Sequence, residues 1–147
     1  MSKVVVANDH GAIELTARIV DFLKSKGYDV NYLGVTEAKS VDYPDMAKLA
    51  CDEFNKGGYE FGIVCCGTGI GISMSANKIH GIRCALPQNI YAAKMAKEHN
   101  DANFLAFGGR IDYQDDVIDM VKAFIETKAS QDERHARRRA KIMALEN

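Results

Sequence analysis

The chain has 147 residues, with 19 basic and 20 acidic side chains and a formal net charge of −1 at pH 7. This length suits one domain, and it is enough to bury a core without disulfides or metal ions. The lack of a basic excess disfavours a general nucleic-acid binder. No run of 18 apolar residues occurs, so we expect no membrane span.

The four cysteines are Cys51, Cys65, Cys66 and Cys84, and none of them forms a Cys-x-x-Cys pair. This spacing disfavours a zinc ribbon or a thioredoxin-like redox site. The first residues lead directly into a short valine run that is interrupted too early to act as a secretion signal. We therefore expect a cytoplasmic protein with reduced thiols.

Short apolar runs alternate with longer amphipathic segments along the chain. The first half predicts a strand at 4–7, a helix at 13–26, a strand at 28–33, a helix from Pro44 to about residue 55 and a strand at 61–65. The second half predicts a helix after the glycines at 67–71, a strand at 82–86, a helix at 89–98, a strand at 103–107 and a helix at 115–128.

Five strands that are each followed by a helix predict a three-layer α/β/α Rossmann-like domain. The expected domain covers residues 1–147 and contains a five-stranded parallel sheet. The charged tail at 131–146 contains helix formers and predicts an extra C-terminal helix. No strand remains to pack behind this helix, so it would either dock on the domain or reach a partner subunit.

Ligands of open α/β sheets bind beyond the carboxyl ends of the strands. Asp9 and His10 follow the first predicted strand, Cys66 and the glycine-rich segment 67–71 follow the third, and Arg110 follows the fifth. Backbone amides of such a turn can hold a phosphate or a developing oxyanion. The same glycines also fit a tight strand-to-helix turn without a ligand, so this motif alone does not decide between the two.

Cys66 directly precedes the glycine-rich turn. A helix N-terminus favours the thiolate form of a nearby cysteine, which could then act as a nucleophile or a general base. An inert buried cysteine is the alternative. Cys65 should point to the opposite face of the strand and serve the core.

Basic side chains in the second half offer further candidates. Arg134 and Arg138 are spaced i, i+4 and share a helical face that could bind phosphate. A solvated helix face and a nucleic-acid contact are the alternatives. His99 ends a predicted helix, where an imidazole also interacts well with the helix C-terminus.

Seven segments of the chain resemble the ribose-5-phosphate isomerase B family, which includes galactose-6-phosphate isomerase subunits and allose-6-phosphate isomerases. They occur in the order and spacing of that family over nearly the whole chain: Asp9-His10-Gly11, Asp42-Tyr43-Pro44, residues 66–73, residues 75–78, residues 99–103, Gly108-Gly109-Arg110 and Arg134-His135.

The resemblance implies an aldose–ketose isomerase that works through a cis-enediolate without metal or cofactor. It implies that Cys66 is the general base, assisted by the hydroxyl of Thr68, and that His99 opens the furanose ring. The substrate contacts that it implies are Asp9, His10, Asn100, the backbone at Gly67, Gly69, Ile70 and Gly71, and a phosphate clamp of Arg110, Arg134 and Arg138.

The position of His99 predicts a shared active site. His99 precedes the fifth strand and Arg110 follows it, and five extended residues span roughly 17 Å. A pentose phosphate cannot bridge that distance. We therefore expect a homodimer, which could pair further into a tetramer, with His99 and Asn100 serving the partner's site.

Some positions depart from the family pattern and leave the sugar open. Asn8 stands where a small residue or a cysteine is common, and Asp132-Glu133 replaces a usual Gly-Gly pair. Ribose 5-phosphate is the expected substrate. The alternatives are a four- or six-carbon sugar phosphate (allose 6-phosphate or galactose 6-phosphate), a non-catalytic phosphosugar-binding subunit, and a regulatory anion-binding module of flavodoxin-like shape.

Overall fold

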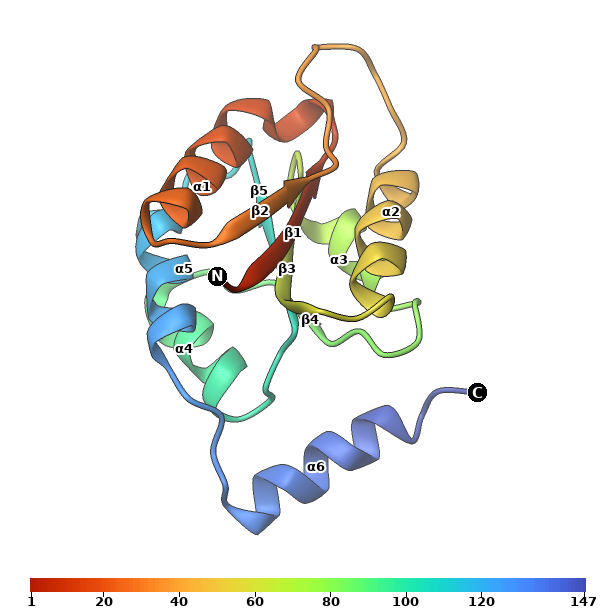
Figure 1. Cartoon of the computed structure of the whole chain (residues 1–147), viewed down its shortest axis with the longest axis vertical. Coiled ribbons are helices and arrows are strands. Elements are labelled where there is room, and N and C mark those ends of the chain that lie inside the picture. Colours follow the sequence, from red (N-terminus) through yellow and green to blue (C-terminus); the bar gives the residue numbers. More distant parts are fainter.

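The apolar runs form a parallel sheet in the computed structural model, which describes residues 1–147 (Figure 1). Its strands are β1 (Lys3–Asn8), β2 (Asp29–Tyr32), β3 (Tyr59–Cys66), β4 (Cys84–Ala85) and β5 (Phe104–Gly108). The helices are α1 (Ile13–Ser25), α2 (Tyr43–Asn55), α3 (Ile70–Ala76), α4 (Ile90–Glu98), α5 (Val117–Glu126) and α6 (Glu133–Met143). The predicted Rossmann-like α/β class is confirmed.

The strand order is β2-β1-β3-β5-β4, and every neighbouring pair is parallel. The chain leaves β1 towards one edge of the sheet and returns as β3 on the other side of β1. The connections therefore diverge between β1 and β3, which is the position where open α/β sheets hold their ligands.

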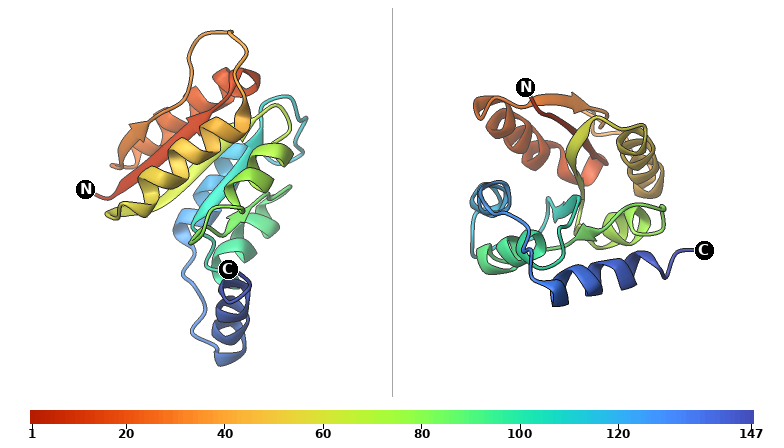
Figure 2. Two further views of the ribbon diagram at one scale, coloured as in Figure 1. Left: turned by 90° about the vertical axis from the view of Figure 1, so that its right-hand side faces the viewer. Right: turned by 60° about the horizontal axis from the view of Figure 1, so that its bottom comes forward.

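Helices α1, α4 and α5 cover one face of the sheet, and α2 and α3 cover the other (Figures 1 and 2). Successive strand residues alternate between two buried clusters, because neighbouring side chains on a strand point to opposite faces. Cys65 packs in the cluster with Phe107, whereas Cys66 packs in the cluster with Phe104. The prediction that the two adjacent cysteines face opposite ways is confirmed.

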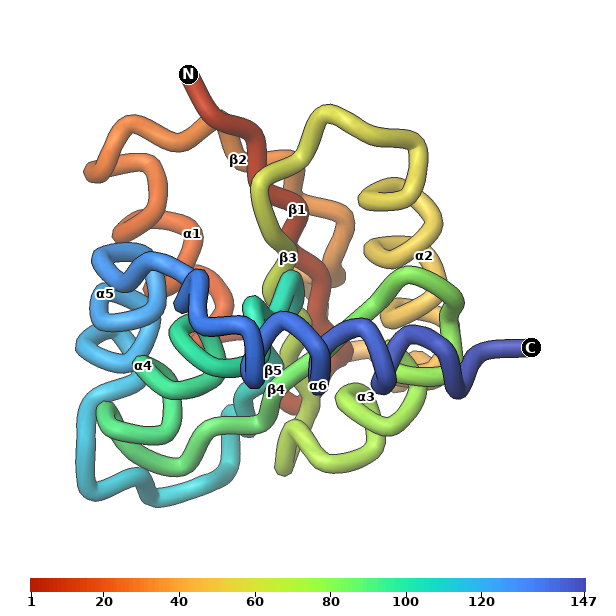
Figure 3. The backbone as a smooth tube through the Cα atoms, turned by 90° about the horizontal axis from the view of Figure 1, so that it is seen from below, coloured from red at the N-terminus to blue at the C-terminus, as the bar shows by residue number.

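Helix α6 contributes no buried residue and lies apart from both layers. Seen from below, it crosses the end of the molecule from the side of α4 towards α3 (Figure 3). This end holds the amino ends of the strands, opposite the loops that follow β1, β3 and β5. None of the helices is long and apolar enough to cross a membrane.

Two local features differ from the sequence prediction. A 3₁₀ turn, His10–Ala12, precedes α1, because the Asp9 carboxylate accepts the Gly11 amide and caps it. Strand β4 has two residues instead of five, because the Asn77 side chain pairs with both backbone groups of Cys84 on the outer edge. An edge strand closed in this way has little backbone left to pair.

Phe104 tests the core behind the cleft. Its ring is fully buried and meets Phe54 edge to face at 5.3 Å between centroids. We expect Phe104→Ala to lower the free energy of unfolding by about 3–5 kcal/mol, through lost burial and an unfilled cavity. Urea unfolding measures this. Leu49→Ala, at a side chain that is 51% exposed, is the control and should change stability by less than about 1 kcal/mol.

Candidate active site

Three loops meet beyond the carboxyl ends of β1, β3 and β5, and backbone hydrogen bonds join them. The Asp9 amide donates to the Cys65 carbonyl at 3.1 Å, and the Gly109 amide donates to the Cys66 carbonyl at 2.9 Å. The Arg110 amide donates to the Gly67 carbonyl at 2.8 Å. The residues that sequence analysis selected after these three strands therefore form one site.

Glycines allow these loops to approach closely. A Cβ atom on Gly11 would lie 2.8 Å from the Gly67 nitrogen. Gly69 adopts a left-handed backbone with φ +78°, and a Cβ there would lie 2.8 Å from both a Leu86 methyl carbon and the Phe107 carbonyl carbon. Larger residues at Gly11 and Gly69 would separate the glycine-rich turn from the loops after β1 and β5, respectively.

Cys66 lies at the base of this turn and is 4% exposed. Its Sγ accepts a hydrogen bond from the Gly69 amide at 3.1 Å. This bond fixes the sulfur beside the backbone amides of the turn. The Thr68 hydroxyl oxygen accepts from the Ile70 amide at 3.2 Å, which leaves the hydroxyl proton of Thr68 available to a ligand.

The other cysteines are held in the thiol form. Burial raises the pKa of both Cys51 and Cys65 to about 12. Burial also raises the pKa of Cys84. All four cysteines are unpaired, and Cys65 is fully buried in the core.

Asp9 and His10 enter the same cleft from β1. Asp9 is 5% exposed, and one of its carboxylate oxygens is used to cap the turn at Gly11. Nδ1 of His10 accepts from the Val41 amide at 3.2 Å. A neutral His10 ring therefore has its proton on Nε2, where it can be donated to a ligand.

Arg110 completes the positive side of the cleft. Its guanidinium lies over the glycine-rich turn, with Nη1 3.1 Å from the position of a Cβ on Gly67. The same cleft has a volume of about 980 Å³ and is also lined by Asp9, His10, Cys66, Thr68, Ile70 and Gly71. The cleft thus combines a thiol, backbone amides, a carboxylate and a guanidinium, a set suited to proton transfer on an anionic substrate.

Part of the wall of this cleft comes from residues that were not predicted to belong to the site. Ser40, Val41, Tyr43 and Met74 also line it. The Tyr43 ring is so close to Gly71 that a Cβ on this glycine would lie 2.5 Å from it. The only signal in the sequence was the motif at 42–44, because nothing local shows where the long loop before α2 will lie.

Asn8 holds that loop in place. Its side-chain amide donates to the Val35 carbonyl at 3.0 Å, and its carbonyl oxygen accepts from the Tyr32 hydroxyl at 2.6 Å. The residue that departs from the family pattern thus anchors the start of a wall of the cleft.

The remaining predicted site residues lie elsewhere in the chain. His99 is the C-cap of α4, and Asn100 follows it towards the amino end of β5. Arg134 and Arg138 are exposed on α6, at the same end of the molecule. One chain therefore brings Asp9, His10, Cys66 and Arg110 into one cleft. The other predicted site residues lie at the opposite end of the molecule: His99, Asn100, Arg134 and Arg138.

Residues 4–142 match the family model described as Ribose/Galactose Isomerase. The chain belongs to this family. Ribose-5-phosphate isomerase B of Clostridium thermocellum is 43% identical, with a TM-score of 0.91 over 97% of this chain and 96% of that one. Ribose-5-phosphate isomerase B of Escherichia coli is 38% identical over 76% of this chain and 74% of its own length. A galactose-6-phosphate isomerase subunit of Clostridium acetobutylicum is 37% identical over 85% of this chain and 72% of its own length.

The predicted resemblance is thereby confirmed, and so is the expectation of a sugar phosphate isomerase of this family. The relatives include enzymes named for a pentose phosphate and a subunit named for a hexose phosphate. The family alone does not choose between these sugars.

Gly69 tests the close packing around the turn. We expect Gly69→Ala to destabilise the protein by about 2–4 kcal/mol, because it adds backbone strain and a clash with the loop after β5. Gly27→Ala is the matched control. Gly27 has a similar φ of +88° but nothing within 4 Å of its Cβ position, so only about 1 kcal/mol should be lost. Equal losses in thermal unfolding would contradict this reading of the turn.

Proposed function

We propose that this chain interconverts ribose 5-phosphate and ribulose 5-phosphate through a cis-enediolate, with Cys66 as the general base. The observation that supports this most is the Cys66 thiol, which lies beside the turn amides and the Arg110 guanidinium in one cleft. The reaction is a pair of proton transfers, so it needs no metal and no redox cofactor. We place it in the cytoplasm, where the four unpaired cysteines would stay reduced.

The thiolate of Cys66 removes the proton from C2 of the open-chain aldose. The electron pair of that C–H bond forms the C1–C2 double bond, and the aldehyde oxygen becomes the enediolate oxyanion. The amides of Gly67, Thr68 and Gly71 stabilise this charge. The Gly69 and Ile70 amides do not take part, since they donate to Cys66 Sγ and to the Thr68 hydroxyl oxygen. The Cys66 thiol then returns the proton to C1.

A hydroxyl proton must also move from the oxygen on C2 to the oxygen on C1 in the same reaction. The Thr68 hydroxyl can relay this proton, because its oxygen is fixed by the Ile70 amide while its hydrogen is free to turn. The product is the ketose, and both Cys66 and Thr68 end in their starting states.

Ring opening precedes this step when the substrate is a furanose. We assign it to His99, which gives a proton to the ring oxygen while the bond from that oxygen to C1 breaks. The C1 hydroxyl loses its proton to water, which leaves the aldehyde. His99 and Cys66 of one chain lie at opposite ends of the molecule, so the partner subunit of a homodimer must supply His99. Asn100, Arg134 and Arg138 would enter with it.

Solvent deuterium tests the chemistry and the sugar together. We expect deuterium from heavy water to enter ribose 5-phosphate at C2 and ribulose 5-phosphate at C1, as followed by NMR. Cys66→Ala should abolish exchange, because no base remains. Cys51→Ala makes the same change in the core away from the cleft and should retain it. Exchange only with allose 6-phosphate or galactose 6-phosphate would reassign the sugar, and no exchange with any of them would favour a binding subunit.

Mixed subunits test the shared site. Cys66→Ala and His99→Gln homodimers should each fail to convert ribose 5-phosphate. After unfolding and refolding an equal mixture, half of the dimers are hybrids, and each hybrid has one site with both native residues. Activity should therefore return to about a quarter of the wild-type value. Continued inactivity of the mixture would place Cys66 and His99 of one chain in the same site.

A further inference from the structure

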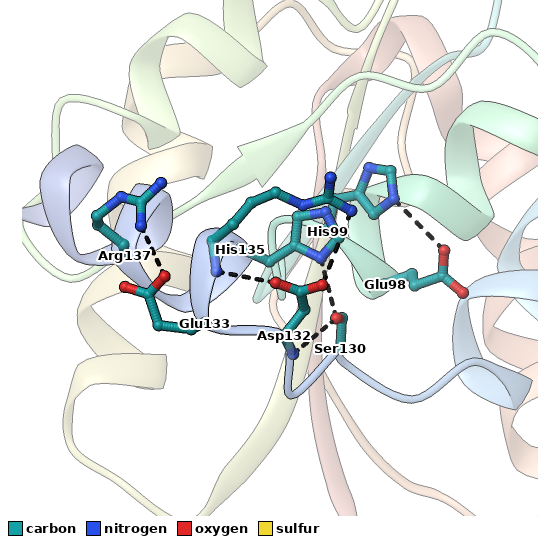
Figure 4. Close-up of polar contacts among 8 residues, drawn as sticks. Glu98, His99, Ser130, Asp132, Glu133, His135 and Arg137 are labelled. Carbon is teal, nitrogen blue, oxygen red and sulfur yellow. Dashed lines mark hydrogen bonds and ion pairs between the residues drawn. The ribbon is translucent and has the colours of Figure 1, made fainter.

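The His99 side chain is held by the C-terminal helix, although the two are far apart in the sequence. The rings of His99 and His135 are stacked, with centroids 4.3 Å apart and planes inclined by 26° (Figure 4). Ser130, in the segment that leads into α6, contacts Nδ1 of His135 through its Oγ at 2.9 Å. One face of the His99 ring is thus covered by a second imidazole.

Arg139 fixes the backbone beneath this pair. Its guanidinium donates to the His99 carbonyl and to the Ser130 carbonyl, both at 3.0 Å. Residues 135 and 139 are spaced i, i+4, so one face of α6 contacts the His99 backbone and ring together. The Ser130 amide also donates to the Glu98 carbonyl at 2.8 Å, which joins the segment before α6 to the end of α4.

We infer that His135 is a positioning residue that sets the orientation of the His99 imidazole for ring opening, with Ser130 and Arg139 as its supports. This inference rests on the ring-opening role of His99 proposed above. The His99 side chain is 43% exposed and follows the last turn of α4, where an unsupported imidazole would sample several rotamers. The stack covers one face of the ring and restricts that freedom, while part of the side chain stays exposed.

The surroundings of His135 favour its neutral form. Partial burial lowers the pKa of His135, and the neighbouring His99 and Arg134 lower it further. Ser130 Oγ accepts from the Asp132 amide at 3.1 Å, so its hydroxyl proton can be donated to Nδ1 of a neutral His135. On the other side, Nε2 of His99 lies 3.5 Å from a Glu98 carboxylate oxygen. The lowered pKa favours a neutral His135, which suits a ring that stacks on His99 and does not itself donate a proton.

Charged side chains reach the His99–His135 pair from both α4 and α6. Glu98 approaches from α4, Arg139 approaches the His99 carbonyl, and Asp132, Arg134 and Arg138 act on His135 from α6 and the residue that caps it. Arg137 lies on another side of α6 and pairs with Glu133 at 2.6 Å (Figure 4). It provides a control on the same helix that does not reach the His99–His135 stack.

The test separates ring opening from the enediolate step. Ribulose 5-phosphate cannot close to a furanose, because its C5 oxygen carries the phosphate, so exchange of its C1 proton needs Cys66 but not ring opening. We expect His135→Ala to lower kcat for ribose 5-phosphate about tenfold. This loss is smaller than the roughly 100-fold or greater loss expected when a general acid itself is removed. Exchange at C1 of ribulose 5-phosphate should stay within about twofold. Ser130→Ala should show the same split with a smaller loss, and Arg137→Ala should leave both rates unchanged.

NMR of the His99 ring protons gives a readout that does not depend on turnover. These protons should move downfield in His135→Ala, because the stacked ring no longer shields them, and should keep their wild-type shifts in Arg137→Ala. Equal loss of both rates in His135→Ala and Ser130→Ala would show a general structural role and overturn the inference. Unchanged rates in His135→Ala would overturn it as well. Failure of the wild-type protein to exchange ribulose 5-phosphate would instead reject the proposed function.

Discussion

The site depends on three backbone hydrogen bonds that join the loops after β1, β3 and β5. They connect Asp9 to Cys65, Gly109 to Cys66 and Arg110 to Gly67. Each ties the loop of one strand to a carbonyl at or just beyond the end of β3, so Cys66 is held between loops on both sides. The thiol orientation follows from the alternation of the strand, and the turn amides follow from the glycines that let these loops meet. A parallel sheet with its switch between β1 and β3 provides this arrangement before any side chain contributes.

Much of this could be predicted from the sequence, because it depends on local patterns. The valine run at 4–6 and the run at 61–65 indicate buried strands, and polar residues after them indicate the ligand end of a parallel sheet. Cys66 and the glycines that follow it could be singled out for the same reason. The opposite facing of Cys65 needs only the period of a strand.

The parts that could not be predicted depend on long-range contacts. Tyr43 reaches Gly71 across a loop that has no periodic pattern, and Asn8 fixes that loop through Tyr32 and Val35. The stack of His135 on His99 requires the segment before α6 to turn back along the end of α4. The composition of residues 131–146 indicates a helix, but its lack of buried residues leaves its direction to a few polar contacts.

The two carboxylates before Arg134 have different effects on a phosphate clamp. Glu133 pairs with Arg137, so its charge is directed away from the other arginines. Asp132 caps α6 by accepting the Arg134 amide, and this hydrogen bond lowers the pKa of its carboxyl group. It therefore stays ionised, with Oδ2 only 3.8 Å from the Arg134 guanidinium.

A phosphate that binds at α6 must share Arg134 with Asp132, whereas Arg138 has no carboxylate within 4.0 Å. The Asp132 carboxylate would thus compete with a bound phosphate for the Arg134 guanidinium. Because Asp132 also caps the helix, it stays in place whether or not a substrate is bound. In the proposed clamp, most of the phosphate binding would then fall to Arg138 and to Arg110 of the other subunit. In the proposed homodimer these two guanidinium groups would approach from different chains, so the dimer interface would set the distance between phosphate and thiol, and with it the length of sugar that fits.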